Sequence, residues 1–188
     1  MSSILDVPFV RQRVHPLSVE AYHTLAELGF IQESAELIQG IVIEKMPKSP
    51  LHVWLVKWLY KKLQANLPEK MDLRREEPLS LRDSEPEPDL AVAEGGMDVF
   101  KKIHPSTARL VIEVSVSTQA LDRAKAAVYA EAGVPEYWLV DGEAKLVSVY
   151  LNPVNGLYQK EVSLGIADRL VSEEFPSLSI QLSELFEN

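Results

Sequence analysis

The chain has 188 residues, of which 46% are hydrophobic and 25% are charged, a balance typical of a soluble globular protein. This length suits one domain with a single continuous core. The absence of cysteine excludes disulfides, thiolate zinc sites and a cysteine nucleophile. The formal net charge of −9 disfavours binding to nucleic acid but does not exclude it, because a bound divalent cation reverses the field of an acidic site.

No apolar run reaches the roughly 18 to 20 residues of a membrane-spanning helix. The first residues lack the basic, apolar and small-residue regions of a signal peptide. We therefore expect a cytoplasmic protein that does not associate with membranes. Residues 1–17 are predicted to be an irregular lead-in, and residues 18–188 a single domain.

The first half of the domain contains a short helix, a hairpin and a longer helix. Ser18 is typical of the cap of a helix over 19–28. Strands over 35–39 and 41–45 then turn at Gly40. After a breaker comes an amphipathic helix, whose expected core face consists of Leu51, Trp54, Leu55, Trp58, Leu59, Leu63 and Leu67. Its lysines, Lys57, Lys61 and Lys62, are expected on the solvated side.

The second half alternates strands and helices. An acidic, proline-rich loop over 76–88 is expected to include a short strand near 79–81, and its acidic part, 83–87, is expected to be solvated. The pattern then predicts strands over 89–93, 109–116, 136–140, 146–151, 158–162 and near 170, with helices over 118–132 and 182–186. This order predicts an α/β fold with a mixed central sheet flanked by helices.

A carboxylate inside an apolar strand is the most informative feature. Glu113 stands among Leu110 to Val114, and a buried unpaired charge is costly, so an arginine, a proton or a metal must compensate it. Asp89 poses the same problem at the start of the preceding strand. Two carboxylates on adjacent strands, completed by a backbone carbonyl and waters, suit Mg²⁺.

Lys125 lies in a helix whose neighbouring residues are small or apolar. Near metal-bound water, a lysine can orient the nucleophile and neutralise charge in a phosphoryl transition state. Each residue alone has a plainer interpretation: a strand glutamate is more often half of an ion pair, and a helix lysine is more often exposed. The combination favours a functional site.

Several segments together resemble a known family. They are 36–40 (ELIQG) with Glu44 and His52, 87–92 (EPDLAV), 110–118 (LVIEVSVST), Asp122-Arg123 with Lys125 and Tyr129, and 132–141 (AGVPEYWLVD). They are similar to the "putative restriction endonuclease" family, a largely uncharacterised bacterial family of the PD-(D/E)XK nuclease superfamily. The resemblance covers roughly residues 18–186.

The resemblance implies a restriction-endonuclease-like core, so that 18–188 would be one nuclease-like domain in which Asp89 and Glu113 bind Mg²⁺ or Mn²⁺. The superfamily's usual lysine position is occupied by Ser115, and Lys125 in the following helix corresponds to the displaced lysine. Glu36 corresponds to an acid that many such cores place near the metal. His52 matches a common family histidine, whose alternative role is a local hydrogen bond at the start of its helix.

The predicted function is therefore metal-dependent endonuclease cleavage of DNA by a homodimer, the dimer by analogy with the superfamily. One alternative is a nuclease fold without catalysis, used to bind DNA or a partner protein. Another is a purely structural ion pair between Glu113 and Lys125. The other histidines, His15, His23 and His104, are assigned no role.

Overall fold

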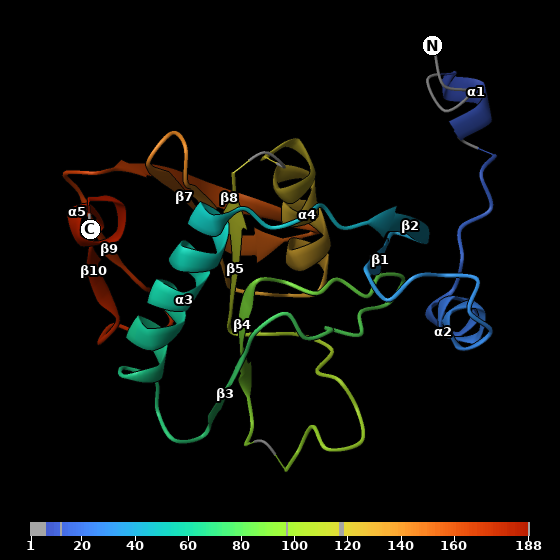
Figure 1. The fold of residues 1–188 in the computed structure, drawn as a ribbon, viewed down its shortest axis with the longest axis horizontal. Coiled ribbons are helices and arrows are strands. Elements are labelled where there is room, and N and C mark those ends of the chain that lie inside the picture. Colours follow the sequence, from blue (N-terminus) through green and yellow to red (C-terminus); the bar gives the residue numbers. More distant parts are fainter. Residues whose placement is uncertain (1–6, 12, 97, 117–118, 188) are drawn as a thin grey trace.

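The computed structural model describes residues 7–11, 13–96, 98–116 and 119–187, and it is an α/β fold built on a mixed six-stranded sheet (Figure 1). The strands lie in the order β3-β4-β5-β6-β7-β8. Their bounds are Met71–Arg74, Leu90–Glu94, Leu110–Ser115, Glu136–Asp141, Leu146–Val154 and Leu157–Gly165. Only β5 and β6 are parallel, and every other neighbouring pair is antiparallel. The predicted mixed sheet is confirmed.

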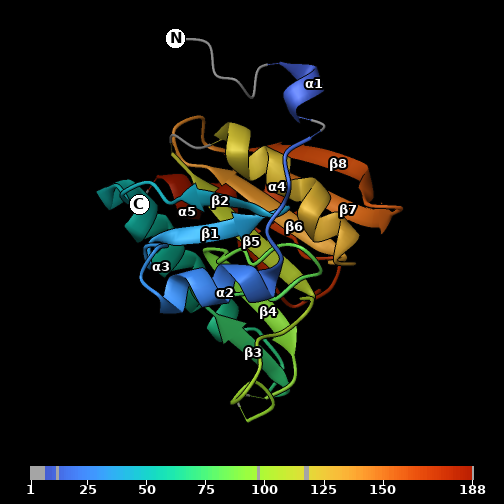
Figure 2. The same ribbon diagram turned by 90° about the vertical axis from the view of Figure 1, so that its right-hand side faces the viewer.

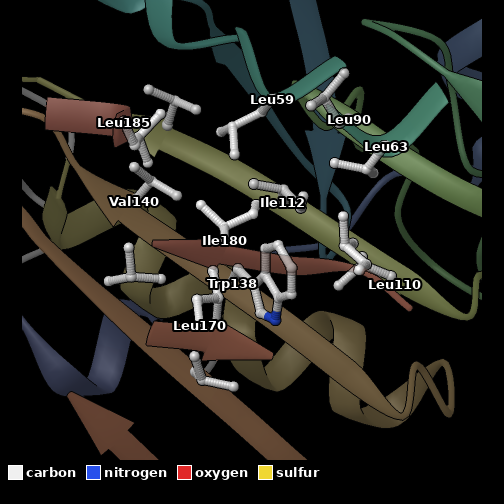
Figure 3. Close-up of a cluster of buried hydrophobic side chains, with 14 of the residues drawn as sticks. Leu59, Leu63, Leu90, Leu110, Ile112, Trp138, Val140, Leu170, Ile180 and Leu185 are labelled. Atoms are coloured by element: carbon white, nitrogen blue, oxygen red, sulfur yellow. The ribbon is translucent and has the colours of Figure 1, made fainter. Parts of the chain in front are cut away.

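Alternation along β5 and β6 divides the core into two layers. Leu110, Ile112 and Trp138 face helix α3 (Pro50–Gln64) and helix α5 (Leu182–Phe186). The short strands β9 (Arg169–Val171) and β10 (Ser179–Gln181) complete this layer, as Figure 3 shows for Leu170 and Ile180 around Trp138. The opposite face of the sheet packs on helix α4 (Gln119–Glu131).

The α4 layer is rich in tyrosines. Tyr129 of α4 packs against Tyr137 of β6 with ring centroids 5.1 Å apart, and Tyr137 stacks on Tyr150 at 5.4 Å. Tyr129 and Tyr137 have no exposed surface. Every second side chain along a strand lies on the same face of the sheet. Glu113 therefore points into this aromatic layer together with Val111.

A separate hairpin lies beside the main sheet. It consists of β1 (Ala35–Ile38) and β2 (Ile41–Glu44), and helix α2 (Val19–Glu27) packs next to it (Figure 2). Gln39 and Gly40 both have positive φ, as the tight turn of a hairpin requires. A Cβ atom at Gly40 would collide with Pro16, so this position needs glycine.

Several element predictions need correction. The strands β3 and β10 were not predicted, and the strand expected near 79–81 is a loop in which the Leu79 N–H donates to the Pro86 carbonyl. The lead-in contains a four-residue helix, α1 (Pro8–Arg11). Residues 1–6, 12, 97, 117, 118 and 188 of the predicted segments lie outside the described residues.

The core face of α3 differs from the predicted one. Its buried stripe is Leu55, Val56, Leu59 and Leu63, whereas Leu51 is 41% exposed and Trp54 is 37% exposed. The stripe therefore passes through Val56 and is rotated away from Trp54. In the part of the chain that the structure describes, no helix is long and apolar enough to cross a membrane.

Candidate active site

The antiparallel pairing of β4 and β5 brings the two predicted carboxylates together. Leu90 pairs with Ile112, which places Asp89, one residue before β4, opposite Glu113. The Asp89 N–H donates to Glu113 Oε2 at 3.2 Å, and the Val114 N–H donates to Asp89 Oδ2 at 2.8 Å. Both residues are buried. Backbone amides thus fix the two carboxylates before any ligand binds.

Helix α4 supplies two further donors to Glu113. The Tyr129 hydroxyl donates to Oε1 at 2.7 Å, and Lys125 Nζ donates to the same oxygen at 3.1 Å. Residues 125 and 129 are one helical turn apart, so they lie on the same side of α4. Burial raises the pKa of Glu113 to about 7, because desolvation and the charge of Asp89 together outweigh the opposing effect of Lys125.

Lys125 is held between two carboxylates. Its Nζ lies 2.8 Å from Glu36 Oε1 and 3.1 Å from Glu113 Oε1, and the residue is only 5% exposed. Burial by itself would lower the pKa of Lys125, but Glu113 and Glu36 more than offset this effect and raise it. The ammonium group therefore stays charged at neutral pH.

Glu36 reaches the site from the separate hairpin. It lies in β1, it is 2% exposed, and its Oε2 accepts a hydrogen bond from the Glu87 N–H at 3.3 Å. The structure therefore gathers all four predicted residues, Glu36, Asp89, Glu113 and Lys125, in one buried cluster.

His52, for which the sequence allowed two roles, belongs to the same cluster. Its backbone N–H bonds locally to Ser49 Oγ, but its ring Nε2 lies 3.0 Å from Asp89 Oδ1. Burial by itself would lower the pKa of His52. The hydrogen bond to Asp89 and the negative charge of Asp89 raise it by more, so the pKa of His52 lies above its ordinary value. Among the described residues, His52 Nδ1 has no hydrogen-bond partner although it is buried.

The cleft over this cluster carries more acids than bases. The acids along it are Glu36, Glu44, Glu76, Glu87, Asp89, Glu113 and Asp122, and the lysines are Lys45, Lys48 and Lys125. Lys45 pairs with Glu87, and Lys48 pairs with Glu76 at 2.7 Å. The cleft is therefore strongly negative without a bound cation.

The acidic segment 83–87 is less solvated than predicted. Glu85 is 7% exposed, and its carboxylate contacts His23 Nε2 at 2.6 Å and accepts a hydrogen bond from the Ser80 hydroxyl at 2.6 Å. His23, which had been assigned no role, thus has a structural partner. Long-range pairs of this kind leave no pattern in the sequence.

The two central carboxylates fit a hard cation better than zinc. Within the described residues, no group of three or more histidine, aspartate or glutamate side chains could hold a metal ion by itself. Zinc sites normally use three or four protein ligands, whereas Mg²⁺ is often held by one or two carboxylates and keeps several waters. Among the described residues, Glu113 Oε1 accepts two hydrogen bonds and Oε2 accepts one, so Oε2 keeps a lone pair for a cation.

Comparison with protein families gives one match that covers most of the chain. The model of the Uma2 family, described as "Putative restriction endonuclease", matches residues 19–183. The chain belongs to the Uma2 family. Among curated proteins no match was found.

A solved structure shares the fold of this Uma2 chain. It is "a putative nuclease belonging to DUF820" from Anabaena variabilis ATCC 29413, with a TM-score of 0.77 and 18% sequence identity. The alignment covers 92% of this chain and 98% of that chain. At this identity the likeness establishes the fold alone.

Proposed function

We propose that the protein is an endonuclease that hydrolyses DNA phosphodiester bonds with the help of Mg²⁺ or Mn²⁺. One observation carries the proposal: Asp89, Glu113, Lys125 and Glu36 meet in a buried cluster at the floor of an open cleft. Buried charges are costly, and a structural core gains little from keeping four of them. Membership of the Uma2 family supports the assignment of a nuclease.

Asp89 and Glu113 would hold the cation. When bound, the cation would supply Lewis-acid stabilisation of the phosphate and a more acidic water. The chain's own contribution is the fixed orientation of both carboxylates by the Asp89 and Val114 amides. This preorganisation means that the ligands need no rearrangement during the reaction.

Lys125 would act as a charged hydrogen-bond donor. An ammonium group has three N–H bonds, and two of them point to Glu36 and Glu113. Among the described residues no further acceptor takes the third, which would donate to the attacking water or a phosphate oxygen. Because its pKa is raised, Lys125 keeps its proton and does not serve as a base. Glu36 would hold the ammonium group in place.

Cleavage assays test the proposal directly. Supercoiled plasmid and short duplexes would be incubated with the purified protein in Mg²⁺, Mn²⁺ or EDTA. We expect metal-dependent cutting that Glu113→Gln and Asp89→Ala abolish while the circular dichroism spectrum is unchanged. The matched control is Glu69→Gln, since Glu69 is exposed and lies outside the residues that line the cleft. Unaltered cutting by Glu113→Gln would refute the assignment.

The cleavage assay also distinguishes the proposed nuclease from the alternative of a binding module, since a binding module would bind metal or DNA without cleaving it. Homodimer formation, with one site for each strand, is a further proposal by analogy with the superfamily, and light scattering after size-exclusion chromatography measures it. Cytoplasmic location stays a prediction from the sequence.

A further inference from the structure

A second cavity, of about 310 Å³, opens near the carboxyl end of β6. Leu51 and Trp54 of α3 form one wall, Leu185 and Phe186 of α5 form another, and the turn containing Gly142 and Lys145 forms the third. Apart from Lys145, these side chains are apolar. The cavity therefore suits a flat apolar group attached to an anion.

Trp54 is the exposed aromatic of this cavity. It is 37% exposed, and no aromatic ring among the described residues stacks against it. Trp58, one turn later, is partly buried and has Lys62 over its ring at 4.9 Å. An exposed indole without a ring partner offers a free face for stacking, and every nucleobase has a matching π-face.

The second cavity adjoins the candidate active site. A Cβ atom at Gly142 would lie 2.8 Å from Leu55 and 3.4 Å from Val116. Leu55 and Gly142 line the second cavity, whereas Val116 lines the catalytic cleft. One layer of side chains thus separates the two, which is close enough for neighbouring parts of one nucleotide strand.

Charge on this side of α3 also suits a nucleotide strand. Lys145 lines the cavity, and Lys57 and Lys61 are exposed on α3, on the same side of the helix as Trp54. The whole chain has a net charge of −9, so broad contact with a duplex backbone would be weak. Stacking on an aromatic side chain supplies binding free energy that depends little on net charge.

We propose that this cavity binds an unpaired nucleobase next to the scissile phosphate, with the base against Trp54 and a flanking phosphate near Lys145. The preferred substrate is then a strand with an unpaired nucleotide at the cut, as in single strands, flaps or bulges. This inference rests on the proposed nuclease function and specifies its substrate class.

The first test measures binding without cleavage. Fluorescence anisotropy would follow a labelled oligothymidylate on protein carrying Glu113→Gln, in Mg²⁺, with and without Trp54→Ala. We expect Trp54→Ala to weaken binding by about five- to a hundredfold, and Trp54→Phe to retain most of the affinity. The matched control is Phe30→Ala, since Phe30 is 77% exposed and follows the C-terminal end of α2, outside the residues that line the cavity.

A second test compares wild-type cleavage of a duplex, of the same duplex with one unpaired nucleotide, and of that duplex with an abasic site at this position. The inference predicts the fastest cutting of the unpaired base and loss of this preference in Trp54→Ala. The inference would be overturned if Trp54→Ala bound the oligonucleotide as tightly as the protein with Trp54, or if neither protein bound it. It would also be overturned if Trp54→Ala converted a dimer into a monomer, because the cavity would then be a contact between two copies of the chain. If this inference failed, metal-dependent cutting that Asp89→Ala abolishes would still support the proposed nuclease function.

Discussion

Replacing Tyr129 with phenylalanine removes one oxygen atom from the most buried part of the candidate active site. The lost hydroxyl donates to Glu113 Oε1 at 2.7 Å, and the ring has no exposed surface. A hydrogen bond to a charged group contributes about 1.5 to 3 kcal/mol, against about 0.5 to 1.5 kcal/mol for a neutral pair. The ionised form of Glu113, which a cation needs, should lose stabilisation of this size. We therefore expect Tyr129→Phe to weaken Mn²⁺ binding by about ten- to a hundredfold.

Calorimetric titration with Mn²⁺ at pH 8 measures this effect, with thermal unfolding followed in parallel. Tyr158→Phe is the matched control, because the Tyr158 hydroxyl belongs to the same aromatic layer but donates to the Val134 carbonyl at 2.8 Å, away from Glu113. The control should lose some stability and keep its affinity for Mn²⁺. Equal Mn²⁺ affinity in Tyr129→Phe and the wild type would refute the idea that the Tyr129 hydroxyl supports Glu113 in metal binding.

Two other predictions concern stability. The pKa of Glu113 rises from 4.5 to about 7 on folding, so the folded state favours the protonated carboxyl. In EDTA, the free energy of unfolding should then fall by about 3 kcal/mol as the pH rises from 4.5 to 7, and remain constant above. Urea unfolding should show this slope in the wild type and lose it in Glu113→Gln; parallel curves would contradict it. Separately, Gly40→Ala should destabilise by more than about 1 kcal/mol, because its φ is +74° and the added Cβ meets Pro16, and an unchanged melting temperature would argue against this turn.

Residues with strong periodic or local patterns could be predicted from the sequence. Ser18 caps α2 through a side-chain bond to the Ala21 N–H, as its position before an apolar helix predicts. Glu113 could be identified because a charge among the four apolar residues of its strand demands a partner. The adjacency of Asp89 and Glu113 also followed from two strands that lie next to each other in the sheet.

Other features depend on tertiary contacts and could not be predicted. The ring of His52 reaches Asp89 across 37 residues of sequence, and nothing near His52 indicates that partner. Strand β3 is only four residues long and half polar, so its pairing with β4 decides its structure. The buried face of α3 was predicted wrongly because both Val56 and Trp54 fit an apolar helical pattern. Packing against the sheet buries Val56 and leaves Trp54 exposed.

The hairpin of β1 and β2 gives the site a wall that lies outside the six-stranded sheet. Among the described strands, the hairpin pairs with no member of the six-stranded sheet, and its contact with the body of the protein includes the Glu36–Lys125 pair. Outside its own two strands, the hairpin is bridged by Leu37 to Glu85 and has no further described strand beside it, so its amides should exchange with solvent through local openings more readily than those of β5 and β6, which have strands on both sides. Each opening would uncover Lys125. A ligand that binds only when Lys125 is held by Glu36 would stabilise the closed hairpin by mass action. It would therefore slow amide exchange in the hairpin without contacting it.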